Sequence, residues 1–196
     1  IVKNSNSSNS KYGVLNVGTG KYVLETKYDS ISYLPYLKQF LVSSNGKYGI
    51  MDQNGKIKLK VAYDDIQVCD NENELYVVKE NALYGIVDSS GTVVLPSSFE
   101  KIGVDKGAFE KNRINNQYIL NSELIPVYYN GLWGFYNIKG EKVTELQYTD
   151  VGCKSVSVTN AYPVVEIPSF KLIVVKVDQK HYGFIDTKGQ STEIPS

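Results

Sequence analysis

The chain has 196 residues, of which 42% are hydrophobic and 21% charged, and its 21 Lys and Arg balance its 21 Asp and Glu. A chain of this length buries about 70% of its unfolded surface on folding, which argues for one or two folded domains and against wholesale disorder. The zero net charge and a single arginine, Arg113, argue against nucleic acid as a partner, because phosphate backbones bind basic surfaces. No apolar run approaches the roughly 20 residues of a membrane-spanning helix.

The first ten residues, IVKNSNSSNS, are rich in Ser and Asn, as flexible linkers often are. We interpret residues 1–10 as a leader that overlaps the first strand, and residues 11–196 as a single repeat domain. Such a leader suits an exported protein from which a targeting segment has been removed. It suits a linker inside a longer polypeptide equally well.

An aromatic residue followed by glycine recurs along the chain, with 36, 36, 49 and 49 residues between successive aromatics. The five pairs are Tyr12-Gly13, Tyr48-Gly49, Tyr84-Gly85, Trp133-Gly134 and Tyr182-Gly183. Two apolar residues and then Asn or Asp follow each pair. A further glycine lies seven positions after the aromatic in four copies and eight positions after it in the first, at Gly20.

A second signature lies fifteen residues after the aromatic of the aromatic-Gly pair in copies two to four and sixteen residues after it in copy one. It consists of an aromatic residue, a polar residue, a third residue and an aliphatic one. In copy one the further glycine and the second signature are both displaced by one residue, so the repeat is genuine. The predicted units are 1–26, 27–61, 62–97, 98–146 and 147–196.

Each unit is predicted to be a set of short strands. Asn45-Gly46 and Asn130-Gly131 predict hairpin turns, and the Asx-x-x-Gly segments predict turns whose Asx side chain binds local amides. A third strand follows each such turn, for example over 142–146 in the fourth copy, and the aromatic-acid-x-aliphatic segment is a fourth candidate. No helical period is sustained over ten residues.

The predicted fold is therefore all-β, with five tandem antiparallel β-meander repeats. We favour an open superhelical stack, because units of 36 residues leave little chain for four full strands. The alternative is a closed five-bladed β-propeller, whose blades typically have four strands.

Two insertions, at 107–123 and 154–169, lengthen the last two units. Both precede the second strand of their unit, so they are expected to protrude on one face, where repeat proteins commonly bind partners. The candidate binding residues in these loops are Phe109, Lys111, Arg113 and Tyr162.

No catalytic, cofactor or metal site is predicted. His181 is the single histidine, and Cys69 and Cys153 have no metal-ligand spacing. The acids at Asp29, Asp64, Glu100 and Asp150 recur once per unit and are interpreted as turn residues. A glycosidase-like enzyme with carboxylates from two units is the catalytic alternative.

The aromatic before each glycine is interpreted as packing into its own hairpin, with the glycine leaving room beside the ring. Flat rings also stack on sugars, so a cell-surface carbohydrate-binding protein that uses exposed Tyr is an alternative. Recurrence at one structural position favours the packing role.

The segment 132–137, LWGFYN, with Gly140 and the four Tyr-Gly versions, resembles the WG or KWG repeat family of bacterial proteins. The resemblance covers nearly the whole chain after residue 10 and implies an accessory module without a common reaction. We therefore expect a noncatalytic binding or scaffold module of a bacterial, exported protein, located outside the cell or at its surface. Its partner is expected to be a protein or a cell-surface glycan.

Overall fold

The computed structural model describes residues 1–4, 10–110, 113–154 and 163–192. In these residues all regular structure is β-strand apart from one 3₁₀ turn, η1 (Pro168–Phe170), so the predicted all-β class is confirmed. The chain divides into two compact units, Ile1–Val93 and Val94–Ser196, and each is described by itself. The single repeat domain over 11–196 stays a prediction beside this division.

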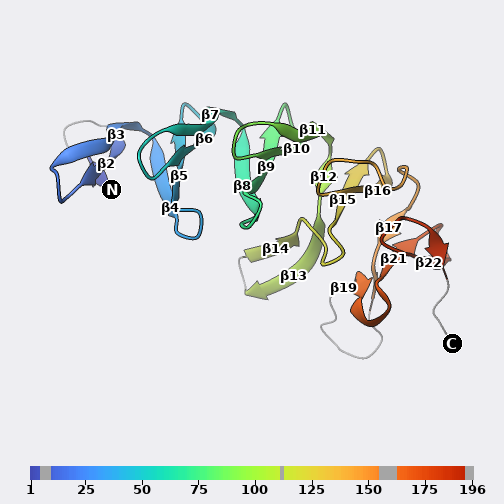
Figure 1. The fold of residues 1–196 in the computed structure, drawn as a ribbon. Coiled ribbons are helices and arrows are strands. Elements are labelled where there is room, and N and C mark those ends of the chain that lie inside the picture. Colours follow the sequence, from blue (N-terminus) through green and yellow to red (C-terminus); the bar gives the residue numbers. More distant parts are fainter. Residues whose placement is uncertain (5–9, 111–112, 155–162, 193–196) are drawn as a thin grey trace. The chain divides into compact units, whose positions relative to one another are not determined.

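The described part of the first unit holds three antiparallel sheets that follow one another along the chain (Figure 1). The first sheet has the order β1-β2-β3, with β1 (Val2–Lys3), β2 (Tyr12–Asn16) and β3 (Lys21–Tyr28). The second has the order β4-β5-β6-β7, with β4 (Ser30–Leu34), β5 (Gln39–Ser44), β6 (Lys47–Asp52) and β7 (Ile57–Tyr63). The third contains β8 (Asp65–Asp70), β9 (Leu75–Glu80) and β10 (Leu83–Asp88), and β11 (Val93–Phe99) begins at the last residue of the unit.

The second unit repeats this plan with the two insertions added. One sheet has the order β12-β15-β16, with β12 (Lys101–Ile102), β15 (Leu124–Tyr129) and β16 (Leu132–Asn137). The other has the order β17-β21-β22-β23, with β17 (Asp150–Val151), β21 (Leu172–Lys176), β22 (Tyr182–Ile185) and β23 (Ser191–Thr192), and β20 (Glu166–Ile167) also pairs with β21. The insertions contribute two-stranded sheets, from β13 (Val104–Glu110) with β14 (Arg113–Gln117) and from β18 (Cys153–Lys154) with β19 (Pro163–Val164).

Two sequence predictions of strands are modified by the structure. The aromatic-acid-x-aliphatic segment is not one strand: its aromatic ends one sheet and its aliphatic residue lies in the next, as Tyr28 and Ile31 do in β3 and β4. The predicted third strand at 142–146 is reduced to isolated bridges of Lys142 and Tyr148. There both Val143 and Thr144 donate their amides to the Phe135 carbonyl, and one shared acceptor interrupts the regular ladder.

The acid of this segment joins consecutive repeats. Asp29 accepts hydrogen bonds from the Lys11 ammonium of the first repeat and from the Asn45 amide of the second, the latter at 2.6 Å. Asp64 does the same one repeat later, with the Lys47 ammonium and with the Asn81 amide at 3.0 Å. These bonds, chiefly those from the lysines, lower the pKa of both carboxyl groups. The carboxylate therefore ties a lysine to the next hairpin turn.

The Asx side chains and the hairpin turns form as predicted. Asp52 Oδ1 accepts the amides of Asn54 and Lys56, each at 2.8 Å. Asn45 and Gly46 have φ values of 52° and 73°, the two positive angles that a tight type I′ hairpin requires.

The glycine of the aromatic-Gly pair leaves room for backbone rather than for the ring beside it. Tyr48 and Ile50 pair with Tyr63 and Leu59, so Gly49 alone faces three residues of β7. A Cβ atom on Gly49 would lie 2.8 Å from both the Leu59 oxygen and the Val61 nitrogen. The irregular partner strand therefore requires glycine at this position.

The turn glycine packs against the preceding repeat. Gly55 has φ +84°, and a Cβ atom there would overlap the Val23 carbonyl oxygen of β3. The later turn glycines lie over the corresponding strand of the repeat before them, Gly140 at Val94 and Gly189 at Val143 and Thr144. This turn is therefore a contact between repeats as well as a change of chain direction.

Apolar pairs complete each junction. The second residue after the aromatic in one repeat shares a buried cluster with the third residue after the aromatic in the next repeat. The pairs are Val14 with Met51, Ile50 with Val87, and Phe135 with Ile185.

Within each unit the sheets therefore contact in chain order, and none of the described sheets closes into a barrel. This agrees with the predicted open stack. It argues against the propeller alternative as well, since the first sheet and the β12-β15-β16 sheet have three strands instead of the four of a typical blade.

Candidate functional site

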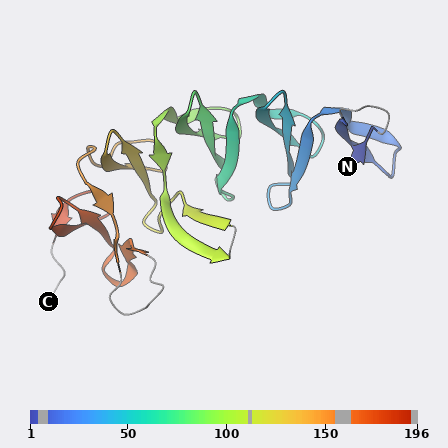
Figure 2. The same cartoon turned by 180° about the vertical axis from the view of Figure 1, so that it is seen from behind.

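Both insertions lie in the second unit and extend to the same side of its repeat sheets (Figures 1 and 2). Of the predicted binding residues, Phe109 lies on β13 and Arg113 on β14, with side chains outside the described part of the structure. Lys111 and Tyr162 lie outside the described residues. Binding through these four residues stays a prediction.

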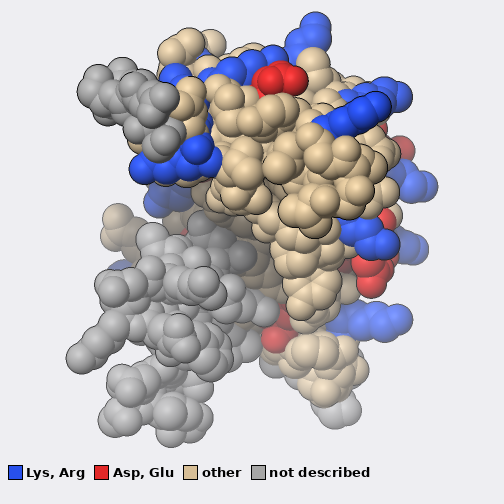
Figure 3. All heavy atoms as spheres, turned by 90° about the vertical axis from the view of Figure 1, so that its left-hand side faces the viewer, with Lys and Arg blue, Asp and Glu red and all other residues tan. Residues whose placement is uncertain are grey.

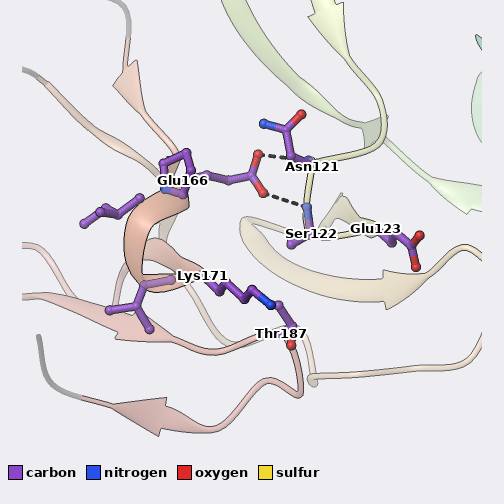
Figure 4. Close-up of a pocket in the computed structure, with 9 residues that line it drawn as sticks. Asn121, Ser122, Glu123, Glu166, Lys171 and Thr187 are labelled. Atoms are coloured by element: carbon purple, nitrogen blue, oxygen red, sulfur yellow. Dashed lines mark hydrogen bonds between the residues drawn. The ribbon is translucent and has the colours of Figure 1, made fainter. Parts of the chain in front are cut away.

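The ends of the two insertions meet at a pocket of about 410 Å³. One wall is the turn that leads from β14 into β15, and the other is the segment from β20 through η1 into β21 (Figure 4). The lining residues are Asn121, Ser122, Glu123, Glu166, Ile167, Pro168, Lys171, Leu172 and Thr187.

Glu166 holds the two walls together. Its carboxylate oxygens accept the backbone amide of Asn121 at 3.0 Å and that of Ser122 at 2.9 Å (Figure 4). The two amides belong to a tight turn in which the Leu120 amide donates to the Leu124 oxygen and the Glu123 amide donates to the Leu120 oxygen. A carboxylate that binds two adjacent amides makes charge-assisted bonds, which are stronger than neutral ones, so the pocket is preformed.

Glu123 and Lys171 occupy equivalent positions in consecutive repeats. Each has a positive φ, 61° and 52°, immediately before the second strand of its repeat. Lys38 and Glu74 stand at the same position in the second and third repeats, with φ 52° and 48°. The pocket therefore uses a backbone feature that the repeat already has, with a long insertion placed before it.

Six of the nine lining residues have polar side chains. The exposed Lys171 extends toward Thr187 (Figure 4), and the buried Ser122 hydroxyl has no hydrogen-bond partner among the described residues. Ile167, Pro168 and Leu172 supply apolar walls. The Lys171 ammonium, the Glu123 and Glu166 carboxylates and the apolar wall together suit the pocket to holding a ligand. The described residues contain no group of three or more His, Cys, Asp or Glu side chains that could bind a metal ion.

The signature aromatics differ in exposure. Tyr12, Tyr48, Tyr84 and Trp133 are partly buried, whereas Tyr182 is 50% exposed. The Lys79 ammonium lies 5.0 Å from the centre of the Tyr84 ring and that of Lys176 lies 5.7 Å from the Tyr182 ring. Trp133 packs on Tyr128, with 5.2 Å between ring centroids. At these three positions a lysine or a second ring thus lies close to the signature ring.

The other candidate groups have local partners. Asp29 and Asp64 bind lysines and turn amides as described above, and Asp150 accepts the Val151 amide at 2.9 Å. Cys69 is a free thiol whose pKa burial raises to about 12. His181 contacts Asp178 at 2.7 Å, and hydrogen bonding, chiefly from His181, lowers the pKa of Asp178 to about 2.

Sequence reasoning did not find Glu166 and Lys171. Glu166 lies near the end of the second insertion, where the repeat pattern has no counterpart for it, and Lys171 lies just after the insertion. Lys171 belongs to a set of residues with positive φ that directly precede the second strand of their repeats. A positive φ is a property of the folded backbone, so the sequence alone did not reveal it.

These features define a class of protein: an all-β array of meander repeats joined by turn glycines and Asp-Lys pairs, with a pocket between two insertions. A model of the WG-containing repeat matches residues 48–84 and 133–153, segments that begin at the signature aromatics Tyr48 and Trp133. The chain thus contains WG-type repeats, as the sequence predicts.

The WG repeat is a noncatalytic repeat module of unknown function. A comparison with curated proteins found no match. No helix in the described residues is long and apolar enough to span a membrane.

Proposed function

We propose that this WG-repeat chain is a noncatalytic binding or scaffold module that holds its ligand in the pocket between the insertions. The Glu166 bridge carries the proposal, because it fixes the ends of both insertions against each other and leaves Lys171 on the rim. A preformed concave site with apolar walls and a few polar groups is the usual form of a ligand site. The apolar walls would take an apolar side chain or ring, while the Lys171 ammonium meets a carboxylate or another acceptor.

We also propose that the protein is bacterial and exported, and that its partner is a protein or a glycan outside the cell or at its surface. The match to the WG-containing repeat supports a bacterial origin, because the sequence resembles the WG repeat family of bacterial proteins.

Selection from a displayed library of random peptides against the folded chain tests the site. The selected peptides should lose about tenfold or more in affinity for Lys171→Glu, which reverses the charge of the rim. They should keep their affinity for Lys56→Glu, a matched control at an exposed lysine of the first unit.

Glu166→Ala adds a second test, because it removes both acceptors of the Asn121 and Ser122 amides. The same peptides should bind this variant more weakly, and Glu166→Gln, which keeps one acceptor, should fall between Ala and the parent. Peptides that bind Lys171→Glu and Glu166→Ala with unchanged affinity would contradict the proposal. An array of glycans probed with the same variants tests the glycan partner, and saturable binding lost in Lys171→Glu would identify it.

A further inference from the structure

The first repeat presents a turn that no described part of the chain covers. Gly20 corresponds to Gly55, because the residue two positions after each glycine has the same partner in its repeat: Tyr22 pairs with Leu15 as Ile57 pairs with Met51. The one extra residue of the first turn is therefore absorbed before Gly20. A Cβ on Gly55 would overlap the preceding repeat, whereas no described atom lies within 4 Å of a Cβ on Gly20.

The apolar half of the junction is open at the same end. Leu15 stands where Met51, Val87 and Ile185 stand, and those three are 1–3% exposed. Leu15 is only partly buried. Around it, Val17 is 94% and Tyr22 50% exposed. Figure 3, which looks onto the side of the molecule where β1–β3 lie, shows a broad uncharged surface with lysines at its edge.

The last repeat presents the complementary half. Phe184 stands where Val14, Ile50 and Phe135 stand, which are 9%, 0% and 0% exposed because the next repeat packs on each of them. Phe184 is only partly buried. Among the described residues, Leu15 and Phe184 are therefore the two halves of the apolar contact between consecutive repeats that have no partner repeat.

We propose that these two surfaces dock on each other in different copies of the chain, so that the last repeat of one copy packs on the first repeat of a second copy. The three junctions within the units show which surfaces fit each other. In each, a turn glycine lies over the third strand of the preceding repeat, and one apolar pair packs beside it. Because the two surfaces differ, the contact is heterologous, and each copy that joins leaves one free surface at either end. The product is a head-to-tail chain of copies.

Sedimentation of the full chain from about 1 μM to about 1 mM tests this proposal. The average mass of the parent should rise with concentration beyond that of a dimer. Gly20→Ala should remain monomeric, because its methyl group would project into the docked strand as one on Gly55 would. Gly46→Ala is the matched control: Gly46 also has a positive φ and no described atom within 4 Å, but it lies in a hairpin turn outside the junction, so it should associate like the parent.

A mixture shows the direction of the contact. Phe184→Lys blocks the other surface, and alone it should also be monomeric. Mixed in equal amounts with Gly20→Ala, it should form a one-to-one dimer and nothing larger, because each variant keeps the surface that the other lacks. Circular dichroism first establishes that Phe184→Lys keeps its sheets, and if it does not, the Gly20→Ala and Gly46→Ala pair decides alone. A parent that stays monomeric throughout, or a Gly20→Ala variant that associates as the parent does, would overturn the proposal.

Discussion

Replacement of the turn glycine should cost far more where the backbone of the preceding repeat lies against it than where it does not. Gly55→Ala and Gly20→Ala both place a Cβ in the left-handed region, at φ +84° and +68°, at a conformational cost of about 1 kcal/mol. Only Gly55 has a neighbour in the way: its Cβ would overlap the Val23 oxygen and lie 3.3 Å from Leu24 Cδ2. Displacing a packed repeat adds about 1–3 kcal/mol, as other overpacked contacts do.

We therefore expect Gly55→Ala to lower the free energy of unfolding by about 2–4 kcal/mol and Gly20→Ala by about 1 kcal/mol. Urea unfolding followed by far-ultraviolet circular dichroism measures both, at a protein concentration low enough to avoid association between copies. Gly91→Ala is an internal control, because its Cβ would lie at an ordinary 3.7 Å from Leu59 Cδ2, and it should resemble Gly20→Ala. Equal losses for Gly55→Ala and Gly20→Ala would refute the assignment of the turn as a contact between repeats.

Four further predictions follow from individual residues. Ala82 has φ +69° in a hairpin turn, so Ala82→Gly should raise the free energy of unfolding by about 0.5–1 kcal/mol and with it the urea midpoint. An unchanged midpoint would argue against backbone strain at Ala82. Trp133→Ala should cost about 3 kcal/mol in chemical unfolding, the low end for aromatic residues because Trp133 is only partly buried. The pKa of Asp64 is lowered from 3.8 in the folded chain, so its contribution to stability is present above that value and is lost as the pH falls through the lowered pKa; Asp64→Asn should make the urea midpoint fall less between pH 5 and pH 2. The Cys69 thiol, with its pKa raised to about 12 by burial, should react with a thiol reagent at pH 8 much more slowly in the folded chain than in urea.

The repeat and its turns could be predicted from sequence because their signals are local. Nearby residues are enough to specify these turns. One kind has an Asx side chain two to four residues from its partner amides, as in Asp52, and the other has an Asn-Gly pair between two strands. The turn at Asn81-Ala82 adopts the same two positive φ angles without glycine, and no local signal marks it. The surrounding strands impose that turn on a residue that does not favour it.

The role of the glycines and the pocket could not be predicted, because both depend on contacts between distant residues. The pattern identifies Gly49 as invariant within the repeat but does not reveal that the opposite strand has two extra residues there. Glu166 binds amides 44 and 45 residues away. This contact occurs once in the chain, so it produces no repeated pattern from which it could be predicted. The predicted binding residues lie in the middle of the insertions and stay a prediction, whereas the pocket forms at the ends of the insertions.

The position of the insertions follows from what the repeats need in order to pack. Each junction uses the turn glycine, the apolar residues on either side of it and, in the first two junctions, an Asp-Lys pair that lies at the hairpin turn. None of these involves the connection between the first and second strands, which is short between β4 and β5 and between β8 and β9. That connection can therefore lengthen without changing a junction, as it does between β12 and β15 and between β17 and β21. Two consecutive repeats that both lengthen there place their insertions next to each other, which accounts for the pocket at Glu123 and Lys171.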